Sequence, residues 1–297
     1  MTSSYSGFVR NDTAAVVSGA PALSTTATTS SNAGSYPITV STGTLATANY
    51  SFLYVNGTLT VQPAPLTITP DGSKTKILGA TFTAFTGMIT GLQHSDAVTV
   101  SYTSKGAASS AAVGSYDITV ASYNFTSGSA SNYAITQNTA TNGLKVLYAS
   151  AGACGGTVGH TILPPINADG TSVWKAGRTI PTQFRVCDAN GNSVGPTAAT
   201  PNVVASYGII KTYAGTVTSV DETVSATNND TAFRWDATGQ QWIYNTKTGS
   251  GTNLVAGYTY LMQIKLVDGT VIGSAGANGA IPIAPFAGTP GYQFGLK

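Results

Sequence analysis

The heptapeptide GSYPITV at residues 34–40 returns as GSYDITV at residues 114–120. The similarity extends on both sides. SGFVRNDTAAV near Gly7 aligns with TGMITGLQHSDAV near Gly87, and ANYSFLYVNGTLTV (48–61) aligns with SNYAITQNTATNGLKVL (131–147). A match sustained over this length is typical of a duplicated domain, so we expect two copies of one structural unit in tandem.

The second copy begins earlier than the first. It opens with APLTITPDGSKTKILGATFTAF (64–85), which combines a strand, a turn and a second strand-like run, whereas Met1 falls just before the equivalent of Gly87. We therefore expect the first copy to lack its opening strand, and the sequence to be a piece of a longer secreted protein. An open sheet edge of this kind invites a strand from another molecule.

Short runs with alternating faces dominate the chain. They include TLTVQ (58–62), AVTVSYTS (97–104), YDITVASY (116–123) and YTYLMQIKLV (258–267). Alternation bounded by Gly, Asn and Asp turns indicates strands. Strong helix formers are scarce, with Glu222 the single glutamate, and no run keeps a helical spacing of apolar residues. The predicted fold class is all-β.

The composition excludes several classes of protein. Only 8% of the 297 residues are charged, 13 basic against 11 acidic, which gives no field that would gather nucleic acid. The 42% of hydrophobic residues argues for an ordered core. There is neither a signal peptide pattern at the start nor a run of 18 apolar residues. A surface rich in Thr, Ser, Gly and Asn is typical of an extracellular bacterial β protein.

The first copy and the start of the second resemble the MBG repeats of bacterial surface proteins and adhesins. The string that carries the resemblance is GFVRNDTAAVVSGAPALSTTATTSSNAGSYPITVSTGTLATANYSFLYVNGTLTVQPAPLTIT. The resemblance implies β-grasp-like modules, a spacer or adhesive role, and no catalytic residues. We expect a truncated repeat over 1–62 and a second repeat over 63–150, joined by the Pro-stiffened segment VQPAPLTI (61–68).

The remaining residues, 151–297, resemble the C-terminal PxKF-type module of bacterial secreted proteins. The motif reads PTQF at 181–184, with Gln183 in place of the lysine. Independently of the resemblance, TQFRVCD, AFRWD, QQWIYN and YTYLMQIKL alternate at the spacing of an immunoglobulin-like sandwich. A Gly/Pro-rich insertion at 272–291 carries Ile281, Ile283 and Phe286, which either form an apolar arm that contacts a neighbouring chain or fold back over the sandwich.

The two cysteines lie in the same predicted domain. Cys154 and Cys187 are expected to form a disulfide in an oxidising compartment, with two separate buried thiols as the alternative. Trp174, Trp235 and Trp242 are expected to pack in the core. The alternative is that Trp174 and Trp242 offer rings to a sugar.

Candidate catalytic groups are sparse. Asp71, Asp169, Asp188 and Asp268 occur in turns and not in a paired acidic motif, and both histidines, His94 and His160, are expected in surface loops without a nucleophile motif. Asp188, Asn190 and Asn192 of DANGN are the one candidate metal site, but a calcium loop needs a distal glutamate that the sequence lacks, so a hairpin turn is expected. We predict no enzyme activity and no cofactor.

Three functions are consistent with these patterns. The first is an extracellular stalk segment with a structural or adhesive role. The second is a fibre or pilus-like subunit that assembles with copies of itself by strand donation. The third is a carbohydrate-binding module. Besides copies of the chain itself, the expected partners are host or surface glycans or proteins.

Overall fold

The computed structural model describes all residues except 150–152, 156, 159, 169, 215–229 and 273–290. The described residues form strands and loops, with two short 3-10 turns, Ala14–Val16 and Ala130–Asn132, and no α-helix. They therefore hold no helix that could cross a membrane. The all-β fold class is confirmed. The strands are β1 (Ala22–Thr25), β2 (Gly34–Ser41), β3 (Gly57–Val61), β4 (Ala64–Pro70), β5 (Lys74–Ile77), β6 (Gly87–Thr90), β7 (Ala97–Thr103), β8 (Gly114–Ser127), β9 (Tyr133–Gln137), β10 (Ala140–Leu147), β11 (Ala153–Cys154), β12 (Thr157–Val158), β13 (Ile162–Leu163), β14 (Val173–Trp174), β15 (Thr179–Phe184), β16 (Val204–Ala214), β17 (Arg234–Asp236), β18 (Gln241–Lys247), β19 (Tyr258–Leu266) and β20 (Tyr292–Leu296).

The first repeat forms one antiparallel sheet in the order β1-β2-β3. The repeated heptapeptide supplies the central strand β2, which pairs Gly34 with Val61 of β3 and Leu23 of β1 with Val40. Tyr36, Ile38 and Val40 alternate with exposed residues, as a strand with one covered face requires. Even so, Leu45 is the one buried hydrophobic residue of this repeat.

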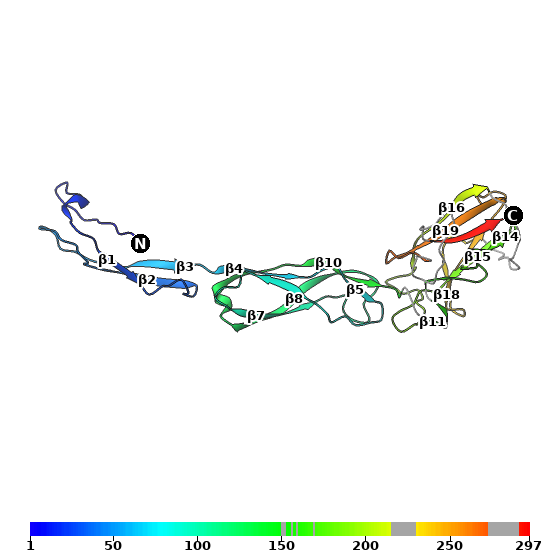
Figure 1. Cartoon of the computed structure of the whole chain (residues 1–297), viewed down its shortest axis with the longest axis horizontal. Coiled ribbons are helices and arrows are strands. Elements are labelled where there is room, and N and C mark those ends of the chain that lie inside the picture. The colour runs from blue at the N-terminus through cyan, green and yellow to red at the C-terminus, as the bar shows by residue number, and fades with distance from the viewer. Residues whose placement is uncertain (150–152, 156, 159, 169, 215–229, 273–290) are drawn as a thin grey trace. The chain divides into compact units, whose positions relative to one another are not determined.

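The second repeat has two sheets (Figure 1). In the first, with the order β6-β4-β9, the central strand β4 is antiparallel to β6 and parallel to β9. In the second, with the order β5-β10-β8-β7, β10 is parallel to β5 and antiparallel to β8. Alternate residues of β4 point inward, so that Leu66 and Ile68 are fully buried.

The chain divides into two compact units. Unit 1 comprises Met1–Pro70, Gly87–Tyr102 and Val120–Asn138, and unit 2 comprises Asp71–Thr86, Thr103–Thr119 and Thr139–Lys297. The division passes through β8, so that each unit holds part of the second repeat. The predicted borders, 1–62, 63–150 and 151–297, follow the sequence repeat and not this division.

The C-terminal part of unit 2 is a sandwich of two four-stranded sheets. One sheet has the order β13-β15-β18-β17, and the other has the order β14-β20-β19-β16. β14 is parallel to β20, whereas the other described pairings are antiparallel. Apolar side chains of both sheets fill the space between them, and the largest of these are Trp174, Trp242, Phe184, Tyr260, Tyr292 and Phe294.

Candidate functional site

A hydrogen-bonded tyrosine and aspartate occur in the same position of both repeats. In the second, the Tyr133 hydroxyl donates to Asp96 Oδ2 at 2.7 Å and accepts from the Gln93 N–H at 2.9 Å. In the first, the Tyr50 hydroxyl donates to Asp12 Oδ2 at 2.6 Å and accepts from the Val9 N–H at 3.3 Å. Burial and the Asp96 hydrogen bond raise the pKa of Tyr133.

The turns that carry these aspartates are also alike. Arg10 and Asn11 have φ of 57° and 64°, and His94 and Ser95 have φ of 51° and 64°. The glycine before each turn has positive φ as well, 91° at Gly7 and 101° at Gly91. The structural equivalent of Gly7 is thus Gly91. The two strings aligned in sequence contain this pair, since GFVRND (7–12) and GLQHSD (91–96) have the same spacing from glycine to aspartate.

The two repeats differ in what surrounds these turns. In the second repeat, β6 and β9 each pair with β4 and with no other strand of the described sheet. The equivalent stretches of the first repeat, 3–6 and 50–54, form no strand, and residues 1–62 include no counterpart of β4 or β5. The outer strands are lost because each depends on the central strand for its hydrogen bonds.

The first repeat meets the second through two asparagines. The Asn132 Nδ2 donates to Asn32 Oδ1 at 2.8 Å, and the Ala33 N–H donates to Asn132 Oδ1 at 3.0 Å. Asn132 thus uses both ends of its amide on the loop that precedes β2. This contact adds to the covalent link between β3 and β4, which is two residues long, Gln62 and Pro63. The Pro-stiffened joint expected at 61–68 contains this link.

Within unit 2, the distal loops of the second repeat are bonded to the sandwich. The Leu78 N–H donates to Leu147 O at 2.8 Å, and the Leu78 carbonyl accepts from Ala189 at 2.8 Å. The Ala149 N–H donates to Cys187 O at 2.9 Å. The disulfide between Cys154 and Cys187, with Cα atoms 5.6 Å apart, links the start of the sandwich region to the same turn.

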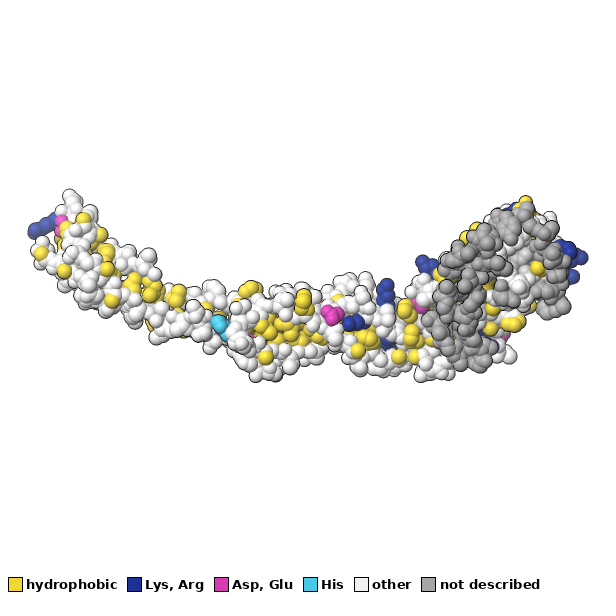
Figure 2. All heavy atoms as spheres, in the orientation of Figure 1, with side chains coloured by type: hydrophobic (Ala, Val, Ile, Leu, Met, Phe, Trp, Pro, Cys, Tyr) yellow, Lys and Arg dark blue, Asp and Glu magenta, His cyan; other side chains and the backbone are white. Residues whose placement is uncertain are grey.

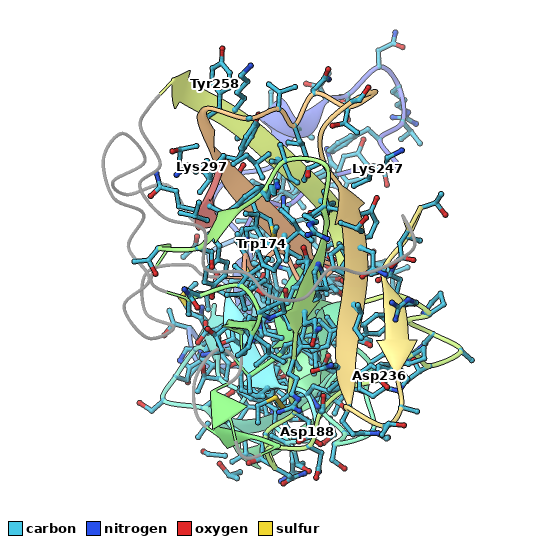
Figure 3. The ribbon with its side chains drawn as sticks, turned by 90° about the vertical axis from the view of Figure 1, so that its right-hand side faces the viewer. Trp174, Asp188, Asp236, Lys247, Tyr258 and Lys297 are labelled. Atoms are coloured by element: carbon cyan, nitrogen blue, oxygen red, sulfur yellow. A yellow bond between two sulfur atoms is a disulfide. The ribbon has the colours of Figure 1, made fainter. Side chains whose placement is uncertain are left out.

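The candidate metal residues belong to that turn (Figure 3). Asp188 Oδ1 accepts from the N–H groups of Asn190 and Asn192, both at 2.9 Å, and Oδ2 accepts from Asn192 Nδ2 at 3.2 Å. Burial by itself raises the pKa of Asp188, but the hydrogen bonds from Asn192 and Asn190 outweigh it and lower the pKa. Its carboxylate therefore organises a turn, as the hairpin hypothesis requires.

His160 is buried, so its predicted place in a surface loop was wrong. It lies between the end of the second repeat and the β19–β20 connection, where Nε2 is 3.2 Å from Thr270 Oγ1. Thr270 in turn donates to Asp268 Oδ1 at 2.6 Å, and Asp268 Oδ2 accepts from the Tyr148 N–H at 2.9 Å. Burial lowers the pKa of His160, with nearby Asp268 acting in the opposite direction. His94, by contrast, is exposed in its turn.

The two tryptophans considered for sugar binding are buried: Trp174 is 0% exposed (Figure 3) and Trp242 is 1% exposed. The Trp242 Nε1 donates to the carbonyl of Val194 at 2.9 Å. Trp235 is partly buried and packs against the same core. The rings of Trp174 and Trp242 fill the sandwich core, since an indole facing inward covers more apolar surface than any other side chain. Ile281, Ile283 and Phe286, the possible interaction arm, lie outside the described residues.

Sequence reasoning missed one buried charge, Lys76 on β5. It is 6% exposed, and its Nζ donates to the carbonyls of Ala80, at 2.8 Å, and Ala108. Burial lowers the pKa of this ammonium group. The segment KTKI gives no signal of this burial, because alternation places Lys76 on the same face as Lys74. The burial follows from the pairing of Lys76 with Val146 of β10.

The described residues show no grouping for chemistry. Among them, no three His, Cys, Asp or Glu side chains come together to hold a metal ion. Lys, Arg, Asp and Glu form no large patch on the visible face (Figure 2).

Comparison with known proteins gives one informative match. The family model "MBG domain (YGX type)" matches residues 1–60 and 66–143, which supports tandem MBG repeats. No curated protein matches the chain. Domains 4–9 of the surface layer protein SbsC match with 14% identity and a TM-score of 0.20, over 89% of this chain and 35% of that one. The chain thus spans about a third of that structure.

Proposed function

We propose that the chain is a non-enzymatic structural segment of an extracellular bacterial surface protein, in which the MBG repeats act as a spacer. The observation that carries this proposal is the same Tyr–Asp turn built twice in tandem, with a two-residue link and an asparagine contact between the copies. A series of modules with few charged residues is suited to span a distance. The disulfide favours an oxidising compartment.

Single-molecule force spectroscopy of the whole chain tests the spacer role. A spacer of serial modules unfolds in separate events, and each lengthens the chain by roughly 3.6 Å per released residue. A single cooperative event for repeats and sandwich together would contradict the proposal. Labelling of surface lysines on intact producing cells with a membrane-impermeant reagent tests the location, because an intracellular protein stays unlabelled.

We further infer that the sandwich is immunoglobulin-like and of the PxKF type. When the strands are lettered A to G in chain order, without the two-residue β14, the sheets are A-B-E-D (β13-β15-β18-β17) and G-F-C (β20-β19-β16). This order is typical of an immunoglobulin domain. Near the start of β19, the buried Tyr260 hydroxyl accepts from the Val255 N–H at 2.8 Å and donates to the Val255 carbonyl at 3.0 Å, like a tyrosine corner. PTQF lies within β15.

Adhesion is a separate proposal. A glycan-binding role would need accessible aromatic rings, and the two tryptophans considered for it are buried. A glycan array probed with the intact chain tests the adhesive role. Binding to any sugar would support this role, and no binding would contradict it.

A further inference from the structure

The repeated GSY sequence begins a strand at the same place in both repeats. In the first repeat this strand starts opposite Val61, the end of β3, and in the second it starts opposite Val146, near the end of β10. β3 and β10 are the last strands of their repeats, so the chain continues from here into the next module. We call residues 32–33 and 112–113, just before each GSY strand, the pre-GSY loops. Both therefore lie at the end of the repeat from which the next module begins.

The tyrosine of each GSY sequence holds the pre-GSY loop in place. The Tyr36 hydroxyl donates to the Asn32 carbonyl at 2.8 Å, and the Tyr116 hydroxyl donates to the Ala112 carbonyl at the same distance. The glycines of the two sequences have φ of 155° and 149°, a region of backbone conformation that favours glycine. The repeated letters thus give both loops the same backbone path and the same anchor.

In the first repeat, the pre-GSY loop contacts the second repeat through polar groups. Asn132 Nδ2 donates to Asn32 Oδ1 at 2.8 Å, and Asn132 Oδ1 accepts from the Ala33 N–H at 3.0 Å. Asn132 precedes Tyr133, whose hydroxyl is bonded to Asp96, so the receiving amide belongs to a well-bonded part of the second repeat. The contact uses the backbone of residue 33 and needs no side chain there beyond a methyl group.

In the second repeat, the pre-GSY loop contacts the sandwich through an apolar side chain. Val113 occupies the position of Ala33 and packs against the buried core cluster of the sandwich, as does Leu78 after β5. Beside them, the Leu78 carbonyl accepts from the Ala189 N–H of the sandwich at 2.8 Å. The same loop position therefore meets a polar partner in one repeat and an apolar partner in the other.

We propose that the pre-GSY loop is the site through which each MBG repeat binds the module that follows it. The GSY tyrosine is a positioning residue, and the loop residue before the glycine matches the partner. Alanine leaves its backbone amide open to an asparagine of another repeat, whereas valine offers apolar surface to a sandwich. The proposal deepens the spacer role and rests on it, because a spacer needs its modules held to one another.

Amide hydrogen exchange in the whole chain, read by nuclear magnetic resonance, measures each contact separately. The Ala189 N–H reports the contact between the second repeat and the sandwich, and the Ala33 N–H reports the contact between the repeats. We expect Val113→Asp to speed exchange at Ala189 at least tenfold, because a carboxylate would be buried against apolar side chains, and to leave Ala33 unchanged. If this variant does not fold, Val113→Ala takes its place, with an expected rise of at least threefold.

Removal of a single hydroxyl tests the positioning role of the tyrosines. We expect Tyr116→Phe to speed exchange at Ala189 at least threefold while the amides of β10 keep their rates, because the ring stays and only the bond to the loop is lost. Tyr36→Phe should have the same effect at Ala33. Tyr123→Phe is the matched control, since Tyr123 lies on the same strand as Tyr116, and it should leave both reporter amides unchanged.

Two results would overturn the proposal. One is unchanged exchange at Ala189 in the folded Val113 variant, which would mean that the loop does not hold the sandwich. The other is an equal rise in Tyr123→Phe and Tyr116→Phe, which would indicate general destabilisation of the repeat. Neither result would reject the spacer role, because separate unfolding events under force do not require strong contacts between modules. A single cooperative unfolding event would reject the spacer role by itself.

Discussion

The hydroxyl of Tyr133 connects β9 to the turn between β6 and β7, because it donates to the Asp96 carboxylate and accepts from the Gln93 N–H. It is 6% exposed, so water cannot replace these bonds. We expect Tyr133→Phe to lower the unfolding free energy of this repeat by about 1.5 to 3 kcal/mol, the range for a hydrogen bond to a charged group. Urea denaturation measures the loss.

Tyr50→Phe is the matched control for this prediction. Tyr50 makes the same bonds but is only partly buried, so water replaces the hydroxyl at less cost. A loss as large as that of Tyr133→Phe would show that burial does not decide the strength of this motif.

His160 gives the molecule a pH-dependent stability with a predictable sign. Its pKa is lowered in the folded state by burial, so the unfolded chain binds the proton more tightly. The unfolding free energy should therefore rise with pH from the lowered pKa up to about 6.5, the ordinary value. Denaturation curves at several pH values across this window measure the slope.

The second histidine serves as the control for this pH effect. We expect His160→Gln to remove most of the rise and exposed His94→Gln to leave it intact, because only the first changes a buried titrating group. An unchanged slope in His160→Gln would assign the pH dependence to other groups.

At the scale of elements, the disulfide closes a segment of 33 residues around β11–β15. The chain-entropy relation gives a loop of this length a stabilisation of roughly 3 to 4 kcal/mol. We expect the double change Cys154→Ala and Cys187→Ala to lower the unfolding free energy of the sandwich by about this amount. Differential scanning calorimetry of both proteins under identical conditions measures the difference.

The same bridge shortens the extension of the pulled chain. In the oxidised chain the disulfide bears the force, so the residues between the two cysteines are not extended. Reducing agent should therefore lengthen the unfolding step of the sandwich by roughly 12 nm at 3.6 Å per residue. A step of unchanged length would mean that the cysteines are not joined in the protein under test.

At the scale of the whole molecule, local stability should be uneven. The first repeat holds a single buried hydrophobic residue, Leu45, whereas the second buries Leu66, Ile68, Ile118, Leu144 and Val146. Little buried apolar surface means a low free energy of local opening. We expect amides of β2 and β3 to exchange with deuterium at least tenfold faster than those of β8 and β10, as measured by mass spectrometry of proteolytic fragments. Similar rates in both repeats would contradict this account.

Much of the strand pattern could be predicted from local alternation. Residues 97–104, 116–123 and 258–267 were predicted as strands and correspond to β7, β8 and β19, with errors of a few residues at the ends. Alternation depends on the side-chain period of two, which is a local property of the backbone. The lack of a β4 equivalent in residues 1–62 was also visible, because a repeat defines what its copy should contain.

The sequence by itself determined the all-β class and the duplication, because alternation and self-similarity can be read along the chain without knowing any contact. Only the tertiary structure decided that Lys76 and His160 are buried and that Tyr133 reaches Asp96. These facts depend on which distant segments meet, and the burial of a polar side chain depends on partners that come from other parts of the chain. A lysine or histidine in a short β-rich segment looks the same in sequence whether water or a backbone carbonyl surrounds it.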